Sequence, residues 1–211
     1  MKFLGKKQTG FTETTAQTLL LGAGVFYKNY VVESDTHAKA VEDGRCLGAT
    51  RGGGEFKATP TIRPIEVDGL NTNTKDNKVI DEWVVTLMAN VLELTKENII
   101  LALVAAGIDE EKSNAKYNAI VGRGYIEPTD YVDNVTFVGR LSGSNDPVVV
   151  QVFNALNTNG LTLQGQNNNE ATMQLIFTAN YGLDDLDTPP FVIYHPKQIG
   201  APAEPTPEEK P

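Results

Sequence analysis

The chain has 211 residues, with 18 Lys or Arg against 27 Asp or Glu, which gives a formal net charge of −9. This length suffices for one domain with a buried core and short arms. The acidic balance argues against a protein that grips nucleic acid, because tight binding needs many cationic contacts to phosphates. A wall past which a polyanion must slide would also avoid cationic residues, so the charge is compatible with a passage for DNA. An ordinary acidic soluble protein is the commoner explanation of the same charge.

Cysteine content and hydropathy indicate in which cellular compartment the protein folds. Cys46 is the single cysteine, which excludes an intrachain disulfide framework and fits folding in a reducing cytoplasm. No stretch approaches the ~20 apolar residues of a membrane span, and we recognise no signal peptide. We therefore expect no membrane partner.

The first part of the chain reads as an arm followed by a strand. Residues 1–17 are polar and contain glycine, with Phe3 and Phe11 as isolated apolar anchors. Such an N-terminal arm either docks on a neighbouring molecule or is disordered. The main domain is expected over residues 18–196. It begins with a strand at 19–33 and a polar, glycine-rich connection at 34–54.

Two long strand patterns then flank a polar loop at about 68–78. In the second pattern, residues 82–92, alternate positions are apolar, which predicts one face in the core. In the first pattern the apolar parity switches from Ile62 to Ile65, and a bulge near Pro64 would explain the switch. Strands of this length would reach ~40 Å. The pattern predicts a hairpin that projects from its own domain.

Prolines in the first strand of this hairpin indicate how it pairs. Pro60 and Pro64 have the same parity, so they remove two backbone donors from one edge and leave the other edge able to pair. The strand should therefore pair on one side only. A long exposed hairpin invites edge-to-edge aggregation, and a neighbouring subunit is one available cover.

The segment after the hairpin predicts a helix and then more strands. Thr95 is placed to cap a helix at about 96–106, with Gly107 as its terminator. Further strands are expected at 117–127, 131–142, 148–156, 161–164 and 172–181. The last of these alternates clearly, and its second face is polar yet almost uncharged. Residues 197–211 are rich in Pro and Glu and should form a disordered tail.

That uncharged face is a candidate lining for a channel, or a merely solvated surface. Its residues are Thr172, Gln174 and Thr178, and the neighbouring pattern adds Thr162 and Gln164 in the same style.

Residues that could carry chemistry form no recognised constellation. His37 and His195 belong to no metal-ligand pattern, and Arg51 with the three following glycines lacks the GK[ST] of a phosphate loop. Asp184, Asp185 and Asp187 could bind Ca²⁺, although a solvated turn before two prolines explains them more simply. We expect no catalytic, cofactor or metal site, and no enzymatic activity.

Three stretches in this order carry a family resemblance: LGATRGGGEF from residue 47, IRPIEVDG from residue 62 and ELTKENI from residue 93. Together they resemble the major tail tube protein family of long-tailed, non-contractile phages that infect Gram-positive bacteria. The resemblance implies a mainly β fold, a β-sandwich or barrel-like tail tube fold with one flanking α-helix and a long β-hairpin. It also implies homo-hexameric rings stacked into a tube through which the genome passes.

The resemblance also implies partners and contact residues. The chain would bind itself, together with tape-measure and tail terminator proteins, and DNA would pass without specific binding. Its location would be the virion tail, after assembly in the host cytoplasm. Residues Asp68, Asn71, Asn73, Lys75, Asp76 and Lys78, with Phe3 and Phe11 of the arm, would contact other subunits. Two alternatives stay open: a monomeric β-sandwich that binds carbohydrate or a surface, and a tube protein of a related contractile secretion machine.

Overall fold

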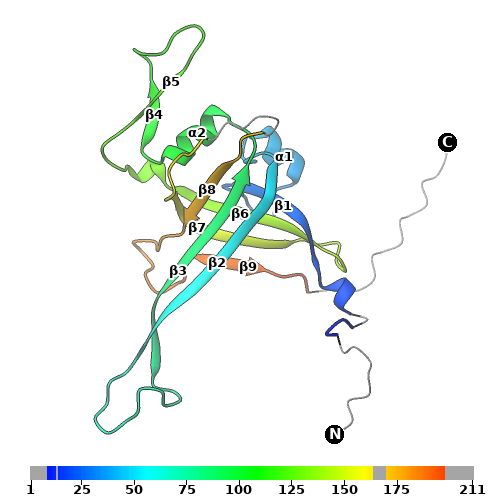
Figure 1. Ribbon diagram of the computed structural model, residues 1–211, viewed down its shortest axis with the longest axis vertical. Coiled ribbons are helices and arrows are strands. Elements are labelled where there is room, and N and C mark those ends of the chain that lie inside the picture. Colours follow the sequence, from blue (N-terminus) through cyan, green and yellow to red (C-terminus); the bar gives the residue numbers. More distant parts are fainter. Residues whose placement is uncertain (1–8, 13, 164–169, 198–211) are drawn as a thin grey trace, which may run out of the picture.

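The computed structural model describes residues 9–12, 14–163 and 170–197 (Figure 1). The strands are β1 (Leu20–Lys28), β2 (Thr50–Pro64), β3 (Lys78–Val91), β4 (Ala106–Asp109), β5 (Ala119–Gly122), β6 (Val132–Leu141), β7 (Val148–Asn157), β8 (Met173–Thr178) and β9 (Phe191–Tyr194). The helices are α1 (His37–Glu42) and α2 (Lys96–Leu103), and short 3-10 turns lie at η1 (Thr15–Gln17) and η2 (Pro128–Asp130). The prediction of a mainly β fold is confirmed.

A seven-stranded antiparallel sheet dominates the structure. Its path runs β1-β6-β7-β8-β3-β2, and β9 pairs with β7 beside this path. Strand β7 joins two halves, since residues 149–152 pair with β9 while Leu156 and Asn157 pair with β8. Buried side chains from both halves form one core: Phe26, Val135 and Val152 from the first, and Val85, Leu87, Leu175 and Phe177 from the second. Burial of this apolar area drives the two halves together.

The β2–β3 hairpin extends well beyond this core. Its strands have 15 and 14 residues, yet β8 pairs only with residues 86–91 of β3. The rest of the hairpin is therefore a two-stranded ribbon, which projects at one end of the long axis (Figure 1). The β4–β5 hairpin projects at the other end. The predicted projecting hairpin is present.

The bulge in this hairpin differs from the expected one. Thr61 pairs with Glu82 and Ile62 pairs with Ile80, so the extra residue is Asp81 of β3. The expected bulge near Pro64 was placed on the wrong strand. Strand β2 ends the sheet path and pairs on one side, as its prolines predicted.

The helix predicted at 96–106 begins as expected but ends earlier. Thr95 caps it, because its hydroxyl accepts the backbone N–H of Asn98 at 3.2 Å. The helix ends at Leu103, where Val104 adopts a φ of 67°, and Gly107 lies inside β4. The predicted boundary and terminator were wrong, because the chain turns at Val104 to start the β4–β5 hairpin.

Three other local expectations need correction. A second helix, α1, and strands β4 and β9 were not predicted, so the expectation of one flanking helix was incomplete. Residues 161–163 have no regular structure, where a strand had been expected. Within residues 117–127 only β5 is a strand, because the sequence on either side of it forms turns.

Val104 gives a stability prediction. A β-branched residue at positive φ costs roughly 1–3 kcal/mol, and glycine avoids most of that cost. Val104→Gly should therefore raise the free energy of unfolding by about 1 kcal/mol, measured by urea denaturation. The control is Leu103→Gly, one residue earlier in helical conformation, which should lower it by about 1 kcal/mol or more. Destabilisation by both substitutions would contradict strain at Val104.

Candidate functional site

An aromatic cluster holds the root of the projecting ribbon. The Trp83 ring lies 5.3 Å from the Phe191 ring, and the Phe56 ring lies 5.7 Å from the same phenylalanine. The backbone N–H of Trp83 donates to the Tyr181 hydroxyl at 2.7 Å. Phe191 is on β9, so the shortest strand of the large sheet connects the ribbon to the first half of the core.

Beyond this cluster the ribbon exposes apolar side chains. Ile62 and Ile80 are direct cross-strand partners, and each is 53% exposed. Other exposed apolar residues of the ribbon and its tip are Ile65, Val67, Leu70 and Val84. Apolar area left in water forgoes about 25 cal/mol per Å². The exposed Ile62–Ile80 pair is therefore a candidate contact surface.

The two edges of the ribbon differ in their capacity to pair. The free edge of β2 carries Pro60 and Pro64, which cannot donate. On the other side, within the described part of the chain, no strand pairs with residues 78–84 of β3. The N–H of Trp83 on this side is already bonded to Tyr181. Strand addition is therefore favoured at β3, beyond Trp83.

The tip of the hairpin is folded around a buried asparagine. Asn77 is 7% exposed, and its backbone oxygen accepts the N–H of Ile65 at 2.7 Å. With its amide nitrogen turned inward, Asn77 donates to the carbonyl oxygens of Thr74 at 2.8 Å and Thr72 at 3.2 Å. The Thr74 hydroxyl donates to the Asn71 carbonyl at 2.7 Å. These bonds give the tip a defined shape.

The residues predicted for subunit contacts lie around this tip. All six of the hairpin are exposed: Asp68, Asn71, Asn73, Lys75, Asp76 and Lys78. Phe11, which precedes β1 in the chain, is 65% exposed. Phe3 lies outside the described residues. Asn77 was missed, because nothing in the sequence separates it from the other asparagines of the loop.

The predicted channel face is formed in part. Gln174 and Thr178 lie on the outer face of β8, and the Gln174 amide donates to Asn90 of β3 at 3.3 Å. The hydroxyls of Thr178 and Thr158 are 2.9 Å apart. Thr162 and Thr172 are exposed but lie outside any strand, and Gln164 falls outside the described residues. The structure thus forms a strip of uncharged polar side chains on β8 and β3, away from the hairpin tip. Glu55 and Lys57 of β2 lie beside it on the same face of the sheet.

The side chains that could carry chemistry have structural partners. The Tyr27 hydroxyl lies 2.8 Å from Nδ1 of His37, and burial raises the pKa of Tyr27 to about 12. Asp35 pairs with Arg45, and hydrogen bonding from that guanidinium lowers the pKa of Asp35. These contacts hold α1 and the segment after it against β1. Among the described residues, no group of three or more His, Cys, Asp or Glu is arranged to hold a metal.

Comparison with known proteins adds no identification. No protein-family model matches the chain, and no curated protein matches it significantly. Within the part of the chain that the structure describes, no helix combines the length and apolarity that crossing a membrane requires. The fold defines a mainly β protein with a projecting two-stranded ribbon.

Asn77 gives a test of the folded tip. Asn77→Ala removes two side-chain hydrogen bonds, which should cost the local structure about 1–3 kcal/mol. Hydrogen exchange of residues 65–77 should speed up by about tenfold or more, while the core strands keep their protection. Asn73→Ala, at an exposed position in the same loop, is the control and should leave exchange unchanged. Equal exchange in both variants would contradict the role given to Asn77.

Proposed function

We propose that this protein is a self-assembling structural subunit that forms hexameric rings, stacked as the tail tube of a long-tailed phage. The single observation that carries this proposal is that the distal half of the β2–β3 hairpin leaves its apolar side chains uncovered. Its apolar residues, including the Ile62–Ile80 pair, are half exposed, and neither a third strand nor the core of the described chain covers them. A second copy would supply that cover.

The design of the hairpin supports specific assembly over unspecific pairing. Its tip is ordered by Asn77, and its β2 edge is blocked by two prolines. A preordered surface loses less entropy on binding than a flexible one. The exposed polar residues around the tip would then select the correct neighbour through directional hydrogen bonds and charge.

The glycines that carry part of the family resemblance have a structural reason. A side chain at Gly54 would place its Cβ 2.1 Å from the Met88 carbonyl oxygen and 2.4 Å from the Phe26 ring. Glycine at this position therefore allows β1 and the root of the hairpin to approach closely. The packing thus accounts for one glycine of the stretch that carries the resemblance.

The remaining parts of the proposal follow from the same assembly. The tube would deliver DNA, which would slide along an uncharged polar lining such as the Gln174–Asn90 strip without specific binding. Tape-measure and tail terminator proteins would be its partners, the host cytoplasm the place of assembly and the virion tail the final location. The proposal includes no catalysis and no cofactor.

Removal of the hairpin tip tests the proposal. Ile65 and Asn77 are joined by a backbone hydrogen bond, so residues 66–76 can be replaced by Asn-Gly as a two-residue turn. The variant should keep its fold by circular dichroism. In negative-stain electron microscopy of concentrated protein it should form no long tubes, whereas the unmodified chain should form hollow tubes with sixfold end views.

The opposite hairpin offers a matched control. Asp109 pairs with Ala119, so residues 110–118 can be replaced by the same Asn-Gly turn. This variant should still form tubes. Normal tubes from the first variant would refute the role of the β2–β3 hairpin.

One observation favours the binding-module alternative. Tyr117, Tyr125 and Tyr131, at or near the β4–β5 end, are 69%, 63% and 38% exposed, and Arg123 lies over the Tyr125 ring. Exposed aromatic rings can stack on sugars through their apolar faces.

A glycan-binding assay separates the two functions. On the assembly proposal, no saturable binding to a glycan array is expected, and Tyr125→Ala changes nothing. Saturable binding that Tyr125→Ala abolishes, by a chain that stays monomeric at high concentration, would replace the tail tube proposal with the binding module.

A further inference from the structure

A short loop after β8 presents an apolar and acidic tip. The backbone N–H of Asp185 donates to the Gly182 carbonyl at 3.2 Å, so Leu183 and Asp184 occupy the centre of a turn. Leu183 is 96% exposed, the highest value among the large hydrophobic side chains described, and Leu186 is 68% exposed. Two exposed leucines in one short loop form an apolar tip that fits contact with another surface.

The loop is held in this shape by one of its own aspartates. The Asp185 carboxylate accepts the N–H groups of Thr188 at 3.1 Å and Asp187 at 3.3 Å. Hydrogen bonding from Thr188 lowers the pKa of Asp185. Asp185 is therefore engaged within the loop, while the carboxylates of Asp184 and Asp187 are exposed.

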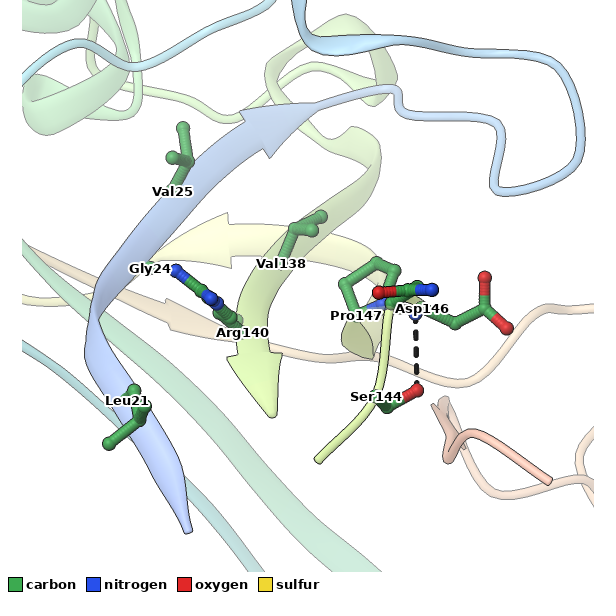
Figure 2. Close-up of a pocket in the computed structure, with 10 residues that line it drawn as sticks. Leu21, Gly24, Val25, Val138, Arg140, Ser144, Asp146 and Pro147 are labelled. Atoms are coloured by element: carbon green, nitrogen blue, oxygen red, sulfur yellow. Dashed lines mark hydrogen bonds between the residues drawn. The ribbon is translucent and has the colours of Figure 1, made fainter. Parts of the chain in front are cut away.

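A groove of about 490 Å³ lies between β1, β6 and the turn that joins β6 to β7. Its apolar lining comes from Leu21, Val25, Val138 and Pro147 (Figure 2). The groove exists because β1 bulges: Leu21 pairs with Arg140 and Val25 pairs with Val138, so residues 22–24 stand opposite Gly139 alone.

Glycine at the bulge is required by close packing. Gly24 has a φ of 64°, and a Cβ there would lie 2.1 Å from the Phe137 ring. Glycine at this position therefore lets β1 lie directly against Phe137 of β6.

Arg140 gives this groove a charge. Among the described residues, none forms an ion pair with Arg140. Asp146 also borders the groove, but its carboxylate points away from Arg140, and its backbone N–H is bonded to the Ser144 hydroxyl at 3.1 Å (Figure 2). The groove thus combines an apolar floor with one available cation, which complements a leucine followed by an aspartate.

The loop and the groove lie on opposite sides of the molecule. In Figure 1 the loop between β8 and β9 is on one side of the domain body, and the turn between β6 and β7, beside β1, is on the other. A chain cannot place its own loop in its own groove, yet each copy presents one of each. Such a heterologous contact repeats from copy to copy and closes into a ring when the rotation permits.

We propose that the loop at Leu183 and Asp184 of one copy docks in the Leu21–Arg140 groove of the next copy. Leu183 occupies the apolar floor, and the Asp184 carboxylate pairs with the Arg140 guanidinium. This inference rests on the proposed self-assembly and names a side-by-side contact for it. The contact is separate from the hairpin, which projects along the long axis.

A charge-reversal cycle tests the contact. Arg140→Glu and Asp184→Arg should each raise the concentration needed for half-assembly, measured by sedimentation velocity, by about tenfold, because each places like charges together. The double variant restores an opposite pair and should recover most of the assembly. Lys116→Glu, the same change at an exposed lysine of the β4–β5 connection, is the control and should assemble normally. Circular dichroism should show that all variants are folded.

The outcomes separate this inference from the proposed function. If the unmodified chain and both single variants assemble alike, the groove contact is wrong and the tube proposal stands. If both single variants weaken assembly and the double variant does not recover it, the pairing of Asp184 with Arg140 is wrong. If the unmodified chain stays monomeric at every concentration, both proposals fail.

Discussion

The structure depends on one mismatch: β3 is much longer than the strand that pairs with its second edge. Strand β8 covers only residues 86–91, so the rest of β3 has β2 as its single partner. An isolated two-stranded ribbon is marginal in water. The ribbon must therefore be held at both ends. The Trp83–Phe191 contact does this at the root and the buried Asn77 at the tip, which explains why β9, only four residues long, contributes to the whole hairpin.

The same mismatch creates a conflict between cohesion and solubility. A ribbon that exposes Ile62 and Ile80 would be stabilised by burying them. Its unpaired backbone N–H and C=O groups, however, would also pair with strands of unrelated molecules. Prolines on β2 remove donors from one edge, and Tyr181 occupies the Trp83 N–H on the other edge. What remains available is a short stretch of β3 beyond Trp83. Apolar area thus provides the driving force, and the restricted edges limit the geometry in which it can be used.

The sequence predicts those elements whose signals are local. The alternation in residues 82–92 and 172–181 identified β3 and β8, and Thr95 marked the start of α2. The α1 helix was missed because six residues are too short for a clear period, and the Asp35–Arg45 pair that supports it joins residues outside it. Strand β9 depends on pairing with β7, a contact distant in sequence. Val104 ended α2 with a β-branched residue at positive φ, which no propensity rule predicts.

The candidate surfaces also differ in whether a local signal in the sequence predicts them. Polar residues between two long strands identified the tip, because loop composition is a local signal. The groove at Arg140 has no such signal: it needs the register shift in β1, the close approach of Gly24 to Phe137 and a turn from a different hairpin. The loop at Leu183 was read as a solvated acidic turn, since composition alone cannot show that a leucine is left fully exposed. Tertiary register, rather than residue type, creates both halves of that contact.

The two proposed contacts would use different physics in different directions. The hairpin projects along the long axis and combines exposed apolar side chains, whose contribution depends little on salt, with charged residues at its tip. The loop and groove lie across that axis and add a charge pair at the surface, which salt screens. Heterologous contacts in one direction close a ring, whereas contacts along the perpendicular direction propagate without limit. On the proposed function, a chain that carries one contact along its long axis and another across it has what a stacked-ring tube requires. The Asp184–Arg140 pair would make the ring-closing contact sensitive to ionic strength.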